Sequence, residues 1–358
     1  MTPTRELHEL GQSLWIDNIT RTMLDDGTLQ RYVDELDVTG LTSNPTIFDN
    51  AIGTGDAYDE QITELQAKGM EGEQLFFELA LADLRRAAKL FEPENERTDG
   101  VDGWVSLEVS PLLADDTPAT IKQVAELHSR AADNTLIKIP GTEAGRTAIE
   151  ESIYAGTPVN VTLLFSAEHY LGAAEAYMRG VERRVEEGLD PEVTSVASLF
   201  VSRWDKAVAD EVPDQLRDKL GISVGKRAYR SYRELLDSER WQRLANEGAR
   251  PQRLLWASTG TKDPNASDVL YVEALAAPQT VNTMPDKTLA AFADHGRVGD
   301  PLPADGGGAE EVLASFGNAG IDIDALAERL QEEGKDSFTS SWRELLGTLS
   351  SKGEKLAA

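Results

Sequence analysis

The segment "NTLIKIPGTEAGR", residues 134–146, places a lysine inside a run that is otherwise typical of a buried strand. A Pro-Gly pair ends this run, and a helix-like pattern follows, so the segment predicts a strand–turn–helix unit. Because side chains alternate along a strand, Ile137 and Ile139 share one face and Lys138 occupies the other. We expect the isoleucines to meet a layer of helices, which directs Lys138 inward.

Short apolar runs of this kind recur along the chain, and most gaps between them carry a helical period. The predicted strands are residues 13–19, 38–43, 103–109, 135–140, 158–165, 193–202, 253–258 and 279–284. An open doubly wound sheet usually has a glycine-rich turn after its first strand, and "DNITRTM" contains no glycine. The sequence therefore predicts an α/β fold, a closed (β/α)8 TIM barrel. We expect extra helices at the N- and C-termini and after the second and sixth strands.

The whole chain, residues 1–358, is predicted to form a single barrel domain. Two long gaps, residues 51–100 and 206–250, hold the additional helices. Beyond residue 295 a loop rich in Gly, Pro and Asp leads into further helical segments. We expect residues 296–358 to be a C-terminal helical extension packed on the barrel.

The composition excludes several classes of protein. Asp and Glu number 63 against 35 Lys and Arg, and the acidic excess is spread over helix-like segments, which indicates a solvated surface rather than an interaction tail. No basic stripe suggests nucleic-acid binding. The chain shows neither a run of about 18 apolar residues nor a signal peptide. These features, together with the lack of cysteine, predict a soluble cytoplasmic protein that binds no membrane.

The alternation that directs Lys138 inward does the same for polar residues late in other predicted strands. These residues are Asp17, Glu108, Asn160, Thr162 and Ser258. The same rule predicts that Leu163 faces outward, toward the helices. It also predicts that Ser258 lies on the inward face of its strand, with Leu255 and Ala257 on the outward face. Barrel enzymes keep their chemistry at the C-terminal ends of the strands. Since unpaired buried charges cost several kcal/mol each, by order of magnitude, the convergence of three ionisable groups predicts a catalytic site rather than packing.

A buried lysine indicates carbonyl chemistry. Burial disfavours a charged ammonium, and a neutral amine attacks carbonyls to form a Schiff base. The protonated imine stabilises a neighbouring carbanion, so C–C bonds are cleaved and formed without a metal. The four histidines stand singly, with no ligand-like spacing, and are interpreted as surface or packing residues. We therefore expect no metal and no cofactor, with Asp17 and Glu108 available as proton shuttles.

Four segments carry a resemblance to a known family. They are "LWIDNI" (14–19), "LTSNPTIF" (41–48), "TLIKIPGTEAG" (135–145) and "NVTLLFS" (160–166). In order and spacing they resemble the transaldolases, Schiff-base enzymes of the class I aldolase superfamily, of the longer bacterial type. The resemblance runs from about residue 10 to about residue 290.

The resemblance implies catalytic roles for four residues. Lys138 would form the Schiff base. Asp17 would take the proton from the C4 hydroxyl of the substrate as the C3–C4 bond breaks. Glu108 and Thr162 would act on the catalytic water.

It also implies a set of binding residues. Asn44 and Asn160 would hold the dihydroxyacetone unit, Ser198 would line its pocket, and Arg203 and Ser258 would bind the substrate phosphate. Ser198, Phe200 and Arg203 all lie in "SLFVSR", which matches a family segment. Many relatives carry an arginine two residues after the phosphate-site serine, where this chain has Gly260. Lys262 is the candidate for that second charge, and a solvated loop lysine is the alternative.

The implied function is transaldolase activity in the non-oxidative pentose phosphate pathway. A dihydroxyacetone unit would move from sedoheptulose 7-phosphate or fructose 6-phosphate to glyceraldehyde 3-phosphate or erythrose 4-phosphate. Phosphorylated sugars would be the only partners, with the chain a monomer or a homodimer. Two alternatives stay open: a fructose-6-phosphate aldolase that releases free dihydroxyacetone, and a barrel that serves as a scaffold. Family patterns at the positions of Glu108 and Phe200 favour the transferase, and Lys138 and Asp17 argue against a scaffold.

Overall fold

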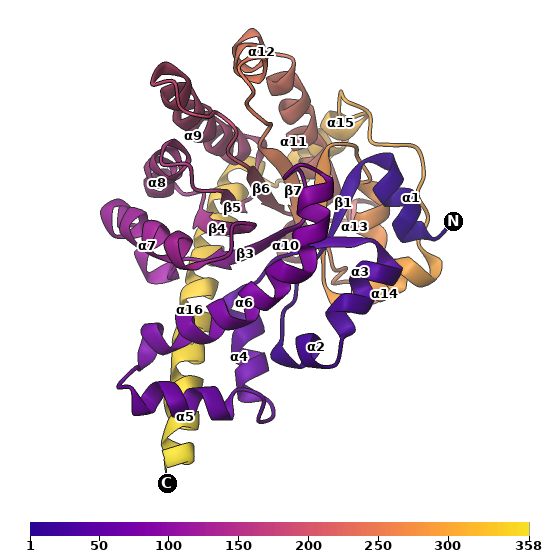
Figure 1. Ribbon diagram of the computed structural model, residues 1–358. Coiled ribbons are helices and arrows are strands. Elements are labelled where there is room, and N and C mark those ends of the chain that lie inside the picture. Colours follow the sequence, from indigo (N-terminus) through magenta and orange to yellow (C-terminus); the bar gives the residue numbers. More distant parts are fainter. Residues whose placement is uncertain (358) are drawn as a thin grey trace.

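The computed structural model describes residues 1–357, which contain a closed barrel of eight parallel strands in sequence order (Figure 1). β8 pairs with β1 and closes the barrel. The strands are β1 (Gln12–Ile16), β2 (Val38–Leu41), β3 (Trp104–Glu108), β4 (Thr135–Pro140), β5 (Val159–Leu164), β6 (Ser195–Phe200), β7 (Arg253–Ala257) and β8 (Thr280–Met284). Each predicted strand is present, and the TIM-barrel prediction is confirmed.

Helices alternate with the strands, and extra helices occur where they were expected. α1 precedes β1, three helices follow β2, three follow β6, and two end the described chain. The helices are α1 (Pro3–Leu10), α2 (Arg21–Asp25), α3 (Thr28–Leu36), α4 (Pro45–Gly53), α5 (Asp59–Ala67), α6 (Gly72–Arg97), α7 (Thr117–Arg130), α8 (Glu143–Tyr154), α9 (Ala167–Glu186), α10 (Ser202–Val208), α11 (Leu220–Leu236), α12 (Glu239–Asn246), α13 (Leu270–Ala274), α14 (Asp286–His295), α15 (Ala309–Asn318) and α16 (Ile323–Ala357).

Two apolar clusters separate the two faces of the barrel wall. The cluster between strands and helices contains Ile137 and Ile139, as predicted. The second cluster contains Leu136, which shares its face with Lys138; it takes in the interior of the barrel and extends to residues of α10, α11, α15 and α16. Residues that pair in register on neighbouring strands project to the same side, and Glu108, Lys138 and Asn160 are successive partners across β3, β4 and β5. Strand register alone therefore brings these three side chains together.

Two predictions from strict alternation are wrong. The pairing of β5 with β6 shifts after Val161, and Leu163 has a left-handed φ of 60°, so Leu163 joins the interior cluster while Leu164 faces the helices. On β7, Leu255 and Ala257 pair in register with Ser198 and Phe200, which line a cavity at the C-terminal end of the barrel, so the face assigned to them was also wrong. Ser258 turns toward the mouth of the barrel because it lies beyond the strand with a φ of 56°.

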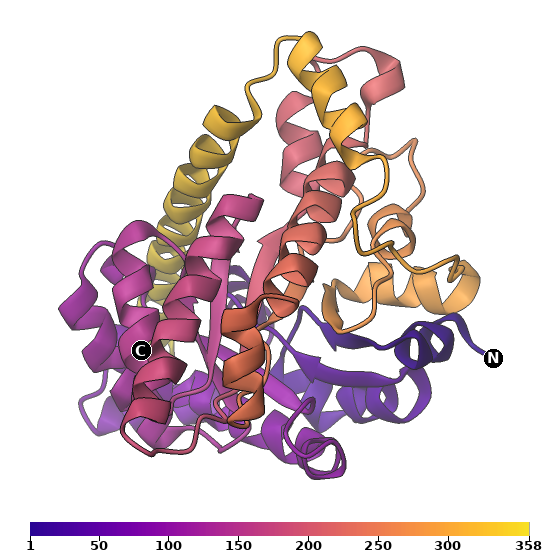
Figure 2. The same cartoon turned by 90° about the horizontal axis from the view of Figure 1, so that it is seen from above.

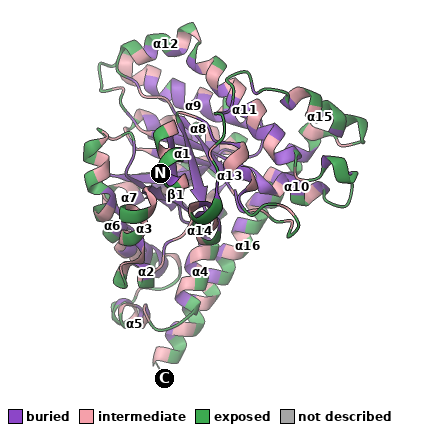
Figure 3. Cartoon of the chain, turned by 90° about the vertical axis from the view of Figure 1, so that its right-hand side faces the viewer, coloured by how far each residue is buried: buried purple, intermediate pink, exposed green. Residues whose placement is uncertain are grey.

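Two of the helical segments predicted beyond residue 295, residues 323–334 and 341–357, form one helix, α16, of 35 residues. α16 runs beside the barrel from α15 toward the C-terminus (Figure 2) and packs mainly against α4 and α5. Together α4, α5 and the end of α16 form an arm that extends from the barrel (Figures 1 and 3). Within residues 1–357, no helix has the length and hydrophobicity needed to cross a membrane.

Candidate active site

Lys138 lies at the centre of the polar groups at the C-terminal end of the barrel. Its side chain is 6% exposed, and its ammonium group donates to the Ser43 carbonyl at 2.9 Å and to Oε2 of Glu108 at 3.2 Å. The Ser43 contact comes from the loop after β2, and the Glu108 contact comes from the in-register neighbour on β3. The amine is thus held in place by β3 and by the loop after β2.

The two predicted carboxylates flank this amine. Burial raises the pKa of Glu108 above its ordinary value, and the charge of Lys138 opposes this shift. Burial likewise raises the pKa of Asp17, against the opposing effects of Lys138 and of a 2.7 Å hydrogen bond from Thr42. Both carboxyls are therefore protonated more readily than in water, as groups that exchange protons with a substrate need to be.

A cavity of about 260 Å³, here called the mouth cavity, opens at this end of the barrel. All the predicted site residues line it except Glu108 and Asn160; those that do are Asp17, Asn44, Lys138, Thr162, Ser198, Phe200, Arg203, Ser258 and Lys262. Glu108 contacts Lys138 directly, and Asn160 accepts a 2.7 Å hydrogen bond from Ser198. The fold thus gathers the whole predicted set, drawn from seven strands and the loops that follow them.

Two asparagines of the site are held by the protein itself. Asn160 is fully buried and also donates to Ser106 at 3.1 Å, so its amide is fixed from both sides. Asn44 caps α4, with Oδ1 accepting from the backbone of Ile47 at 3.1 Å. The amide NH2 of Asn44 is therefore the group left to face the mouth cavity.

Cations gather on one side of the mouth cavity. Burial lowers the pKa of the half-buried Arg203. Partial burial, and then the charges of Lys206 and Arg203, lower the pKa of Lys262 at the rim. Among residues 1–357, neither Arg203 nor Lys262 forms an ion pair with a carboxylate, so this side is set up to receive an anion.

Gly260 and Lys262 are related in space as well as in sequence. A Cβ atom on Gly260 would lie 3.3 Å from Pro285 and 3.9 Å from the amine of Lys262. The lysine amine thus lies over the position from which a side chain at residue 260 would start. Ser258 on the same loop pairs with the hydroxyl of Ser202 at 2.9 Å, which ties the loop to the start of α10.

Sequence reasoning missed several residues of the mouth cavity. Thr42, which holds Asp17, also pairs with Thr283 at 2.7 Å; it lies in the quoted segment "LTSNPTIF", two residues before Asn44. Thr46 follows in the first turn of α4. Ser337 and Phe338 come from α16, and no motif in the sequence marks them. Among the residues described, no group of His, Cys, Asp and Glu side chains could hold a metal ion.

A model of the transaldolase/fructose-6-phosphate aldolase family matches residues 14–349 of the chain. The chain belongs to the transaldolase family. It is 44% identical over 356 residues to a transaldolase of Arthrobacter sp. FB24, covering 97% of this chain and 96% of the relative. It is 45% identical over 359 residues to a transaldolase of Kocuria rhizophila, covering 97% of each chain. Transaldolase 2 of Nostoc punctiforme is 40% identical over 367 residues.

The names of these relatives favour the transferase among the alternatives that the sequence left open. The family description covers both transaldolases and fructose-6-phosphate aldolases, whereas these relatives, aligned over nearly their whole length, are transaldolases. The chain is therefore an enzyme with transaldolase function. The transaldolase resemblance inferred from four short segments is confirmed.

Proposed function

We propose that this transaldolase moves a dihydroxyacetone unit between sugar phosphates through a Schiff base on Lys138. The observation that carries the proposal is the position of Lys138, a buried amine between two carboxyls with raised pKa values, at the edge of a cavity lined by unpaired cations. A buried amine beside carboxyl groups can attack a ketone and exchange the protons that imine formation requires.

In the proposed reaction, Nζ of Lys138 adds to C2 of the donor ketose and water leaves. Asp17 takes the proton of the C4 hydroxyl, the C3–C4 bond breaks, and its electron pair moves into the imine to give an enamine. The aldose phosphate departs, and C3 of the enamine then bonds to the aldehyde carbon of the acceptor, whose oxygen takes the proton back from Asp17. Addition of water to the imine carbon breaks the C–N bond and frees the new ketose and Lys138.

Two unpartnered oxygens support a role for Glu108 and Thr162 in handling water. Oε1 of Glu108 and Oγ1 of Thr162 are buried, and neither has a hydrogen-bond partner within residues 1–357. Buried polar groups are rarely left in this state unless they have a functional partner. We infer that they position the water that is lost and regained at the imine carbon.

Arg203, Ser258 and Lys262 are our proposed phosphate ligands. Arg203 provides a fork of donors, and Lys262, over Gly260, provides the second charge that relatives take from an arginine. The net charge of the chain is −28, which repels an anion at long range, so these local cations are needed to attract a sugar phosphate. Asn44, Asn160 and Ser198 are proposed to bind the hydroxyls of the three-carbon unit, beside the Phe200 ring.

Borohydride reduction in the presence of fructose 6-phosphate tests the proposal. Reduction traps the enzyme-bound imine as a stable amine, so peptide mass mapping is expected to find a three-carbon unit on Lys138. A Lys138→Arg variant, and a sample without the ketose, serve as controls that stay unlabelled. A label on another residue, or no label on the wild-type enzyme, contradicts the proposal.

We also propose a domain organisation, a location and an oligomeric state for the chain. Residues 1–358 are proposed to form a single domain with 296–358 packed on the barrel, and the contacts of α16 with α4, α5 and α6 support this. A cytoplasmic location agrees with a chain that has no cysteine. The choice between monomer and homodimer is open to sedimentation measurements.

A further inference from the structure

Phe338 on α16 is the only large aromatic side chain that the C-terminal helix contributes to the mouth cavity, within the part of the chain that the structure describes. Its ring centre lies 5.9 Å from the amine of Lys138 and 5.9 Å from the guanidinium carbon of Arg203. The ring is 8% exposed and packs on Phe200 with a centroid distance of 6.4 Å. The ring of Phe338 is thus within about 6 Å of both the reacting amine and the proposed phosphate ligand.

α16 is fastened to the barrel on both sides of Phe338. Before it, Gln331 donates to the Leu163 carbonyl at 2.8 Å. After it, Ser341 pairs with Thr46 at 2.9 Å, and the Trp342 indole donates to Glu73 at 2.8 Å. These contacts reach β5, α4 and α6 and hold the ring in a fixed place over the mouth.

Gly334, one helical turn before Phe338, shows how closely the helix approaches the site. A Cβ atom on Gly334 would lie 3.0 Å from Leu163 Cδ2 and 3.2 Å from Nη1 of Arg203, tighter than normal packing. A glycine inside a helix costs roughly 0.5–1 kcal/mol relative to alanine. The close approach of the helix to Arg203 gives a physical reason for a glycine at position 334.

An aromatic ring in this position affects the enzyme-bound imine in two ways. The protonated imine is a cation within about 6 Å of the ring, the range of a cation–π contact. The ring, which is 8% exposed, also covers the imine against bulk water. Water is required at the imine carbon only before and after the transfer, and in between it competes with the acceptor.

We propose that Phe338 shields the three-carbon intermediate from bulk water, so that α16 decides between transfer to an acceptor and release of free dihydroxyacetone. The side reaction is balanced as follows: C3 of the enamine takes a proton from Asp17, water adds to the imine carbon, and the C–N bond breaks. Dihydroxyacetone leaves, and Lys138 is regenerated. This inference rests on the proposed Schiff base.

The test measures two rates in Phe338→Ala: transfer from fructose 6-phosphate to an acceptor aldose phosphate, and release of dihydroxyacetone without acceptor. The ratio of release to transfer is expected to rise roughly tenfold, which is the change in rate that corresponds to the free energy of a desolvated cation–π contact. Phe338→Tyr keeps the ring and is expected to retain the wild-type ratio. Leu330→Ala, which truncates a buried side chain of the same helix outside the mouth cavity, is the matched control and leaves the ratio unchanged.

A second measurement follows the intermediate itself. Borohydride added at increasing times after removal of excess donor gives the lifetime of the trappable adduct, which is expected to shorten in Phe338→Ala. An unchanged ratio and lifetime in that variant, with normal labelling of Lys138, overturns the role of Phe338 alone. Equal changes in Leu330→Ala also overturn it, and absence of the adduct from the wild-type enzyme overturns the Schiff base instead.

Discussion

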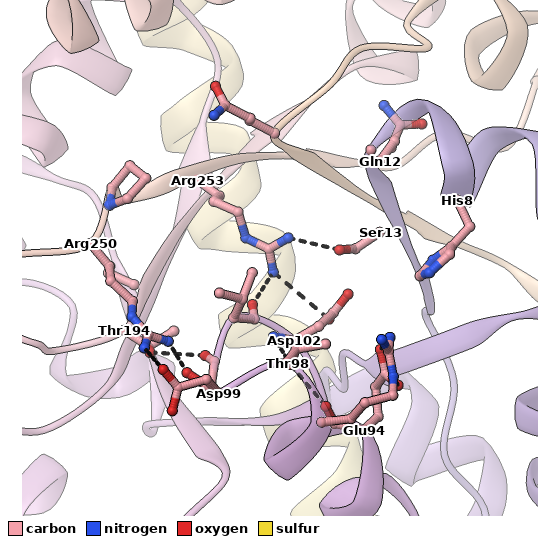
Figure 4. Close-up of a pocket in the computed structure, with 17 residues that line it drawn as sticks. His8, Gln12, Ser13, Glu94, Thr98, Asp99, Asp102, Thr194, Arg250 and Arg253 are labelled. Atoms are coloured by element: carbon pink, nitrogen blue, oxygen red, sulfur yellow. Dashed lines mark hydrogen bonds and ion pairs between the residues drawn. The ribbon is translucent and has the colours of Figure 1, made fainter.

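The two ends of the barrel both contain buried charges, but they satisfy them differently. At the N-terminal ends of the strands lies a second cavity of about 510 Å³, here called the base cavity, which is larger than the mouth cavity of about 260 Å³. In the base cavity Arg253 donates to Ser13 and to the Val101 carbonyl, both at 2.7 Å, and lies 3.7 Å from Asp102 (Figure 4). Asp102 accepts hydrogen bonds from Trp15 and Thr39, both at 2.8 Å.

The charges at the base are therefore neutralised within the protein, whereas at the mouth the Lys138–Glu108 ion pair lies beside two cations that have no carboxylate partner in the described part of the chain. Arg250 at the base likewise pairs with Asp99 and Glu192. At the mouth, Oε1 of Glu108 and the cations Arg203 and Lys262 have no such partners within the described residues 1–357. Polar atoms without a partner among the described residues, such as Oε1 of Gln12, occur at the base as well, so the two ends differ in their unpaired cations rather than in cavity volume or in unpaired polar atoms.

The largest expected effect at the mouth comes from Lys138→Arg. An arginine stays charged and cannot form an imine, so kcat is expected to fall by at least about 10⁴-fold, as when a covalent nucleophile is removed. Steady-state kinetics with fructose 6-phosphate and an acceptor measures the loss. Retention of more than a hundredth of the activity contradicts the assignment of Lys138 as the nucleophile.

Asp17→Asn is expected to lower kcat by about 10²–10⁴-fold, the range for loss of a general acid–base group. The imine on Lys138 should still form, because its amine and Glu108 are unchanged. Borohydride labelling combined with turnover measurements separates the two steps. A normal turnover number removes Asp17 from C–C bond cleavage, and loss of labelling moves its role to imine formation.

At the base, Asp102→Ala is expected to reduce stability instead of activity. The change leaves the Trp15 indole and the Arg253 guanidinium short of a buried acceptor, at a cost of about 3 kcal/mol in the free energy of unfolding. Urea unfolding measures this cost, while kcat at 25 °C stays within about twofold of wild type. Asp99→Asn, at the exposed rim of the same cavity, should cost under about 0.5 kcal/mol. A large loss of kcat in folded Asp102→Ala breaks the contrast between the two ends.

Lys262→Ala is expected to raise KM for the sugar phosphate by about fivefold, with kcat nearly unchanged. A charged hydrogen bond at the rim contributes less binding free energy than a buried one, and this contribution decreases with added salt. Lys287→Ala, which removes the same charge from an exposed residue of α14 outside the mouth cavity, is the control. Equal changes in KM for the two variants indicate general attraction instead of a phosphate ligand.

The smallest expected effect is a pH-dependent gain in stability from Asp17→Asn. Burial raises the pKa of Asp17 in the folded state above its ordinary value of 3.8. The folded protein therefore loses stability as the pH rises from 3.8 through the raised pKa, because the buried carboxyl then has to ionise. The variant is therefore expected to unfold at a higher temperature than wild type at pH 7, with the difference vanishing below pH 3.8. Calorimetry at both pH values checks this, and a lower unfolding temperature at pH 7 contradicts it.

The sequence by itself determined the barrel and most of its reactive centre. Strand alternation placed Lys138 and Glu108 inward, and register on a parallel sheet then set Glu108, Lys138 and Asn160 side by side. Alternation failed at Leu163, where a shift in pairing interrupts the period, and at β7, where Leu255 faces the interior. Ser258 reached the mouth through a left-handed turn, which a pattern of apolar residues does not encode.

Only the tertiary structure decided what covers the site. Alternation along a strand is a local property and is written in neighbouring residues, so sequence patterns reveal it. The approach of Phe338 to Lys138, and the need for Gly334 beside Arg203, depend on how α16 packs against elements remote in the chain. Close packing between distant elements depends on the shape and volume of the side chains at the contact. It leaves no periodic pattern in the sequence, so the sequence did not reveal these two contacts.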